Sequence, residues 1–236
     1  MTDARATARV TDSAPAATAA DALVVLVRPA AEGPGVRVLD GTDLPDPVVA
    51  DLTAALGAVG AGGSADETTR VPAPGGIATA SVLAVGVGRG DADEHEVLRR
   101  AGGAAARALT GVQTALLAPP STDPALVGAL TEGALLGAYA FTTFRSGTPT
   151  AVLREVLVPA VEGLDLASAT AVATAVHRAR DWVNTPPGDL PPAVFAEQIS
   201  AAARAVVIDV EVLDDPALGE QGYGGVVGVG PGTAKP

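Results

Sequence analysis

The stretch LVVLVR, residues Leu23–Arg28, decides the fold: it is a continuous apolar run that ends in one arginine. A short apolar run without polar alternation is typical of a strand that is buried on both faces. VRVLD (Val36–Asp40) follows across the turn EGPG (Glu32–Gly35), and we expect the two segments to pair. A strand of this kind requires covering layers on both sides of its sheet.

Apolar strands and helical segments alternate along the next 160 residues. Asp123 is a candidate N-cap with Pro124 in the first turn of its helix. GAGGSADETT (residues 60–69) is expected to be a flexible loop. The alternation predicts an α/β layer structure. The predicted strands are 77–88, 113–119 and 153–159, and the predicted helices are 47–59, 91–109, 121–141 and 164–183.

A proline cluster, Pro186–Pro192, marks the start of a second structural unit, because residues that precede proline leave the helical region. After it we expect a helix over 193–206, a strand VIDVEVLD (Val207–Asp214), a short helix over 216–222 and a glycine-rich strand GGVVGVG (Gly224–Gly230). Residues 1–20, rich in alanine and threonine, are expected to be a loose tail.

Composition narrows the function classes. The 236 residues carry a formal net charge of −12, 48% are hydrophobic and only 3% are aromatic. The apolar content can form a real core, which Ala, Val, Leu and Gly must fill. An acidic surface without a basic run repels phosphate backbones, so nucleic-acid binding is not expected.

The absence of cysteine excludes disulfides and thiolate metal sites. The N-terminus lacks the charged-then-apolar order of a signal peptide, and no apolar stretch approaches the roughly 20 residues that span a bilayer. We therefore expect a cytoplasmic protein with no membrane partner.

Three segments, in order, resemble the M17 leucyl aminopeptidase family. Thr131–Ser146 is similar to the family's E-G-x-x-L-G-x-Y-x-F stretch. Arg180–Glu197 is similar to the R-x-[LW]-V-N-T-P pattern that opens its catalytic domain, with Gly188-Asp189 where an asparagine is more usual. Val210–Pro236 is similar to a glycine-rich segment further into that domain.

The resemblance implies a domain scheme. Residues 1–20 would be a flexible tail, 21–163 a macro-domain-like N-terminal α/β domain, 164–184 a long linker helix, and 185–236 the beginning of an incomplete α/β catalytic domain. It also implies an enzyme that removes N-terminal amino acids from peptide substrates, and a homo-hexamer.

The resemblance further implies a two-metal centre (Mn, Zn or Mg) that activates a water molecule. In the family the metal ligands lie in K-G-[IL]-x-[FY]-D-x-G-G and N-T-D-A-E-G-R-[LM] stretches, both beyond the third segment. Neither stretch occurs in residues 1–236. We therefore assign no catalytic, cofactor-binding or metal-binding residue to this chain, and expect it to be inactive alone.

The two histidines invite other interpretations. His95 lies in DEHEV, but no second histidine follows at the spacing of a zincin motif, which favours a solvated residue at a helix start. His177 lies on the long predicted helix, where a surface or interdomain contact is favoured over catalysis.

Two glycine-rich stretches resemble nucleotide-binding loops superficially. AVGVGRG (Ala84–Gly90) has the spacing G-x-G-x-G, and GGVVGVGPG (Gly224–Gly232) lacks a following Gly-Lys-Ser/Thr, so turns and close backbone packing are favoured. Asn184 is expected to cap the long helix rather than shape a catalytic entrance. Trp182 and Tyr223 are expected to be packing anchors at the domain junction.

Two rival functions stay open at this stage. The first 160 or so residues could form a non-catalytic macro-like module that captures a nucleotide or ADP-ribose. The chain could instead be a truncated paralogue that joins hexamers without catalysing a reaction.

Overall fold

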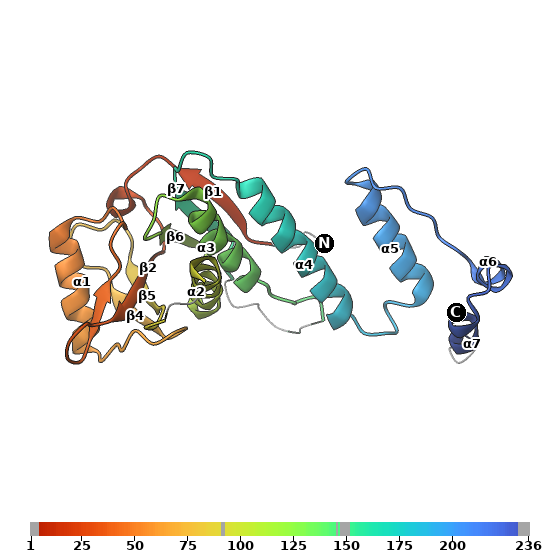
Figure 1. Ribbon diagram of the computed structural model, residues 1–236, viewed down its shortest axis with the longest axis horizontal. Coiled ribbons are helices and arrows are strands. Elements are labelled where there is room, and N and C mark those ends of the chain that lie inside the picture. Colours follow the sequence, from red (N-terminus) through yellow and green to blue (C-terminus); the bar gives the residue numbers. More distant parts are fainter. Residues whose placement is uncertain (1–4, 91–92, 145, 147–151, 231–236) are drawn as a thin grey trace. The chain divides into compact units, whose positions relative to one another are not determined.

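The computed structural model of the chain describes residues 5–90, 93–144, 146 and 152–230 (Figure 1). It divides into two compact units, Met1–His177 and Arg178–Pro236. The division falls inside one helix, after His177, whereas the domain scheme from the sequence placed boundaries after residues 163 and 184. Each unit is described by itself below.

A single sheet organises the first unit. Seven strands of the described residues belong to it, in the order β1-β7-β6-β2-β5-β4, with β3 pairing β2. The β1–β7, β7–β6, β6–β2 and β2–β5 pairs are parallel, and the β5–β4 and β2–β3 pairs are antiparallel. The strands are β1 (Thr7–Thr11), β2 (Ala22–Pro29), β3 (Val36–Val38), β4 (Thr68–Pro72), β5 (Ser81–Gly86), β6 (Thr114–Ala118) and β7 (Glu155–Pro159).

Helices cover both faces of this sheet, which confirms the predicted α/β class. One core contains α1, and the other contains α2, α3 and the first part of α4. Figure 1 shows α1 and the α2–α3 pair on opposite sides of the strands. The helices are α1 (Asp46–Ala58), α2 (Glu94–Ala108), α3 (Pro124–Gly137) and α4 (Leu166–Asn184), with a short 3-10 turn, η1 (Pro15–Ala17).

The central strand β2 explains why the run LVVLVR has no polar alternation. Leu23 and Val25 face the core with α1, whereas Val24 and Leu26 face the core with α2 and α3. Because β2 has a parallel neighbour on each side and a helical layer on each face, the five apolar residues of the run, Leu23–Val27, are all buried. The predicted pairing with Val36–Val38 is confirmed, with Val27 opposite Val38.

Local helix signals are also confirmed. The Asp123 carboxylate accepts the backbone N–H of Ala125 at 2.8 Å, and Pro124 occupies the first turn of α3. Asp93 caps α2 in the same way, by accepting the N–H of His95 at 3.1 Å. These residues satisfy donors that a helix start otherwise leaves without partners.

The first 20 residues are not wholly a loose tail, contrary to expectation. Thr7–Thr11 forms β1, an edge strand that pairs with β7, with Thr7 opposite Glu155. Arg9 Nε donates to Glu155 Oε1 at 2.9 Å across that pair. The strand gains its hydrogen bonds from a partner nearly 150 residues away, so a local apolar signal was not needed to form it.

The glycine-rich loop expected over residues 60–69 ends earlier than predicted. Thr68 and Thr69 begin β4, which pairs with β5 in antiparallel register, with Thr69 opposite Ala84. Strand β4 lies at the sheet edge, where polar side chains are tolerated on the exposed face.

The second unit is helical where the structure describes it. It contains the end of α4 and three helices, and Pro191 and Pro192 begin the first of them. The strands predicted over Val207–Asp214 and Gly224–Gly230 are wrong: the former has no regular structure, and the latter contains α7. A strand needs a hydrogen-bonding neighbour, and the described residues of this unit provide none. The three helices are α5 (Pro192–Arg204), α6 (Asp215–Glu220) and α7 (Gly224–Val229).

Candidate functional site

The first family-like segment, from Thr131 to residue 146, holds α3 against α2. A Cβ atom on Gly133 would fall far inside contact distance of the Arg99 carbonyl oxygen, and one on Gly137 would lie 2.5 Å from the Gly103 carbonyl oxygen. Gly102 likewise faces the Leu130 backbone. Two helices can approach this closely only where side chains are missing, so these glycines are required by packing.

The same segment also contacts the long helix α4. His177 Nε2 lies 3.4 Å from the Leu136 carbonyl oxygen, and the His177 ring centroid lies 5.2 Å from that of Tyr139. His177 was expected to make a surface or interdomain contact; the surface position is wrong, because the residue is only 3% exposed. It follows Ala169 and Ala173 along one buried stripe of α4, so it is a packing residue of the first unit.

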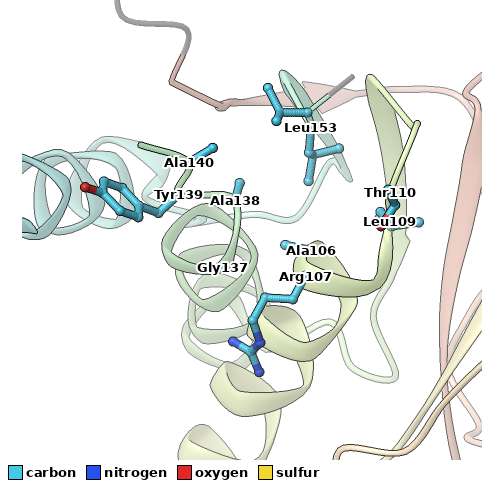
Figure 2. A pocket seen from close by; sticks show the side chains of 10 residues that line it. Ala106, Arg107, Leu109, Thr110, Gly137, Ala138, Tyr139, Ala140 and Leu153 are labelled. Atoms are coloured by element: carbon cyan, nitrogen blue, oxygen red, sulfur yellow. The ribbon is translucent and has the colours of Figure 1, made fainter. Parts of the chain in front are cut away.

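A hollow of about 240 Å³ lies beside this junction, where the C-terminal ends of α2 and α3 meet the chain before β7. Figure 2 shows its labelled side chains, with the Tyr139 ring extending away from most of the others. The lining is largely apolar, and Arg107, Thr110 and Tyr139 supply its polar side-chain groups. It offers no pair of nucleophile and base.

A second hollow, of about 510 Å³, lies between the first turns of α2, α3 and α4. Its polar lining includes His95, Arg99, Glu132, Asp165 and Ser168. The N-terminus of a helix attracts anions through its free N–H groups. At each of these three helices, however, an aspartate side chain already accepts hydrogen bonds from such N–H groups. Asp165, for example, accepts the N–H groups of Ala167 and Ser168 at 3.0 and 3.1 Å. His95 is exposed in the first turn of α2, as expected.

The described residues do not form a metal site. Within 5–90, 93–144, 146 and 152–230, no three histidine, aspartate or glutamate side chains lie close enough together to hold an ion. His95 and His177 occupy different surroundings, one exposed and one buried. The described residues therefore do not fit a two-metal centre, and they support no catalytic step.

The glycine stretch Ala84–Gly90 is a strand-to-helix turn, as favoured above. A Cβ on Gly86 would collide with the Ser64 carbonyl oxygen, and Gly88 donates its N–H to the Gly63 carbonyl at 3.0 Å. Arg89 reaches back to the Ala30 carbonyl at 2.7 Å. The backbone groups that a phosphate loop would present are here in contact with a neighbouring loop.

The carboxylates whose pKa values are lowered are structural. The N–H groups of Thr114 and Gln113, each 2.9 Å away, lower the pKa of Asp21. The N–H groups of Gly62 and Ser64, at 2.7 and 3.0 Å, contribute to lowering the pKa of Glu67, although partial burial opposes the shift. Asp21 holds the start of β6, and Glu67 holds together the loop that precedes β4.

In the second unit, the segment after Arg180 packs the end of α4 on α5. Trp182 stacks edge-on against Phe195, with ring centroids 5.1 Å apart, and its Nε1 donates to Gln198 Oε1 at 2.8 Å. Just after the end of α4, the Thr185 hydroxyl donates a hydrogen bond to the Asp181 carbonyl at 2.7 Å. Asn184 is the last residue of α4, at the helix end where a cap was expected. Trp182 is thus a packing residue, and Tyr223 is half exposed.

Comparison with solved structures shows that the chain has a leucine-aminopeptidase-like α/β fold. It superposes on a mutant of tomato leucine aminopeptidase with a TM-score of 0.71 at 22% identity, covering 93% of this chain and 47% of that one. At this identity the likeness concerns the fold. It also superposes on "Bottromycin maturation enzyme BotP" with a TM-score of 0.70 at 30% identity, covering 92% and 44%.

The sequence then places it in a family. Residues 8–148 match "Cytosol aminopeptidase family, N-terminal domain", and residues 177–236 match "Cytosol aminopeptidase family, catalytic domain". The chain belongs to the cytosol aminopeptidase family, as the three segments suggested.

Curated relatives agree with this assignment. A "Probable cytosol aminopeptidase" of Nocardia farcinica is 45% identical over 229 residues, which are 92% of this chain and 45% of the relative. One from Streptomyces avermitilis is 42% identical over 236 residues, 91% of this chain and 46% of the relative. The chain thus spans about half the length of the curated relatives it matches. Within the described residues, no helix combines the length and apolar composition needed to cross a membrane.

Proposed function

We propose that this chain supplies the N-terminal domain and the first catalytic-domain elements of an aminopeptidase that removes N-terminal residues from peptides. The observation that carries the proposal is the match to both family domains in sequence order, residues 8–148 and then 177–236. The glycine-to-backbone contact of α2 and α3 gives the family-like segment from Thr131 a physical role in the first domain.

We further propose that the complete enzyme uses two divalent metal ions, with manganese, zinc or magnesium as candidates. Family membership supports this, as does a solved structure titled "Bottromycin maturation enzyme BotP in complex with Mn", 28% identical with a TM-score of 0.68. Such ions would supply Lewis-acid activation of water. Because the described residues lack a ligand set, we assign them scaffold roles and propose that the metal ligands belong to other residues of the family's catalytic domain.

Peptide substrates, a homo-hexameric assembly and a cytoplasmic location complete the proposal. The relatives' names, which contain the words cytosol aminopeptidase, support the location and the substrate class. The hexamer follows from the family resemblance alone. Sedimentation of the chain by itself, and with a full-length relative, tests whether it enters hexamers as a non-catalytic subunit.

The decisive assay is leucine p-nitroanilide hydrolysis with added manganese. The chain by itself is expected to show no turnover above a heat-denatured sample. A chimaera that continues this chain with the catalytic-domain remainder of the Nocardia farcinica relative is expected to be active, and EDTA should abolish that activity. Metal-dependent turnover by the unextended chain would contradict the assignment of the ligands to other residues.

A further inference from the structure

The arginine that ends the central apolar run has a buried nitrogen without a partner. Among the described residues, Arg28 Nε is the one buried side-chain nitrogen or oxygen that makes no hydrogen bond. No carboxylate in the described part of the chain forms an ion pair with Arg28, although the sequence has 27 acidic residues against 15 basic ones. Buried charged groups are normally paired, because burial removes their hydration. The Arg28 guanidinium is therefore available to an anion.

The described carboxylates on the neighbouring loop are engaged elsewhere. Gly63 packs against the backbone of Arg28, since a Cβ on that glycine would lie 2.7 Å from the Arg28 carbonyl carbon. The same loop carries Asp66 and Glu67. Asp66 pairs with Arg100 of α2, and Glu67 accepts N–H groups within its own loop. The loop therefore lies beside Arg28 without neutralising it.

A second arginine faces Arg28 across the β2–β3 pair. Arg28 and Arg37 are directly opposite in the antiparallel register, so their side chains leave the same face of the sheet. That face is the one toward α2 and α3, because Val24 and Leu26 of the same strand point into that core. Like charges in this position repel each other. Asp40 lies 3.3 Å from Arg37, but its side chain is 96% exposed, so the pair of arginines keeps a net positive charge.

The two arginines lie at the carboxyl end of the central strand. The parallel strand that follows β2 in the chain is β5, on one side of it, whereas the strand that follows β6 is β7, on the other side. The strand order therefore reverses between β2 and β6, and open α/β sheets bind ligands outside the carboxyl ends of the strands at such a reversal. Arg89, which follows β5, donates to the Ala30 carbonyl at 2.7 Å and brings another guanidinium to this edge.

We propose that Arg28 and Arg37 bind the phosphate group of a small molecule at this edge of the sheet. A guanidinium donates parallel N–H bonds to an oxyanion, and a phosphate monoester presents three acceptor oxygens, enough to bridge two guanidinium groups. Bridging would give Arg28 Nε an acceptor and offset the repulsion between the strands. The net charge of −12 disfavours a polymer of phosphates, which leaves a small phosphate as the ligand class. The inference is independent of the proposed peptidase, because it needs neither metal ligands nor turnover.

Calorimetric titration of the chain with inorganic phosphate and with phenyl phosphate, at constant ionic strength, tests the proposal. Arg28→Gln removes the charge, and Arg28→Lys keeps the charge but not the planar fork. Arg154→Gln is the matched control, because Arg154 is exposed and immediately precedes β7, at the amino edge of the sheet. Titration with acetate measures whether a carboxylate binds equally well.

We expect a Kd for phosphate of about 1 mM or below in the unaltered chain. Binding should be weaker by about tenfold or more in both Arg28 variants and unchanged in Arg154→Gln. Tighter binding of phenyl phosphate would identify an esterified ligand, and equal binding would identify the free ion; both results support the site. Absence of binding at about 10 mM phosphate, equal affinity for acetate, or unchanged affinity in Arg28→Gln would overturn it.

Urea denaturation in phosphate-free buffer separates a ligand-binding role of Arg28 from a structural one. Without phosphate, Arg28→Gln should be at least as stable as the unaltered chain, because it removes an unpaired guanidinium and its repulsion with Arg37. Added phosphate should raise the urea midpoint of the unaltered chain and of Arg154→Gln, but not that of Arg28→Gln. A loss of stability in Arg28→Gln without phosphate would assign the arginine to the fold itself and contradict the proposal.

Discussion

His177 Nε2 lies 3.4 Å from the carbonyl oxygen of Leu136, which joins the long helix α4 to the end of α3. The Tyr139 ring packs on the same imidazole with its centroid 5.2 Å away. Residues of the family-like segment thus contact the helix that leads toward the second unit. The contact gives Tyr139 and His177 a role in packing rather than in chemistry.

Replacing His177 with alanine should destabilise the first unit by about 1–3 kcal/mol, because it removes a buried ring and its hydrogen bond. Urea denaturation followed by far-UV circular dichroism measures the change. His95→Ala is the matched control: His95 is exposed, so its substitution should alter stability by no more than about 0.5 kcal/mol. Equal effects of the two substitutions would refute the packing role.

Gly133→Ala should destabilise the protein by about 3 kcal/mol or more, because the new Cβ would collide with the backbone carbonyl of Arg99 and neither helix can yield locally. Gly128 lies on the same helix with nothing within 4 Å of its hypothetical Cβ. Gly128→Ala should therefore be neutral or stabilising by up to about 1 kcal/mol, from helix propensity. Thermal unfolding of both variants checks the contrast, and a tolerated Gly133→Ala would disprove the close approach.

The elements set by local chemistry were predictable from sequence. Strand β2 follows from an apolar run, and the start of α3 follows from Asp123 and Pro124. Strand β1 was missed because its hydrogen bonds come from β7, and Thr7 and Glu155 are distant in sequence. The strand expected at Val207 was wrong for a related reason: a pattern suited to a sheet does not form one without a neighbouring strand.

The roles of the family-like residues were only partly predictable. Gly133 and Gly137 were visible as a motif, but their purpose depends on Gly103 and the Arg99 carbonyl on another helix. Paired glycines inside two predicted helices could have signalled that contact. The burial of His177 could have been found from its spacing, four residues after Ala173 on the buried stripe of α4.

Asp21 should make stability depend on pH in the acid range. The N–H groups of Thr114 and Gln113 lower its pKa in the folded protein below the ordinary 3.8. Its contribution is therefore fully present above about pH 4 and is lost as pH falls through the lowered folded value. Asp21→Asn should cost about 1 kcal/mol at pH 7, a figure kept small by solvent screening, and nothing once Asp21 itself is protonated.

Urea denaturation of Asp21→Asn and the unaltered protein from pH 7 to pH 2 measures this dependence. The exchange rates of the Gln113 and Thr114 amide protons provide a local control, since both should rise in the variant. A stability difference that stays constant across the whole pH range would show that the carboxylate charge is not the stabilising feature.

The two units should unfold separately, because both apolar cores found among the described residues belong to the first. Trp182 is the chain's single tryptophan and packs on Phe195 within the second unit, so its fluorescence reports that unit alone. Far-UV circular dichroism is dominated by the first unit. We expect the fluorescence transition at lower urea than the dichroism transition, a departure from two-state behaviour. Phe195→Leu should shift the fluorescence midpoint only, and Gly133→Ala the dichroism midpoint. Coincident transitions in all three proteins would mean that the units fold as one.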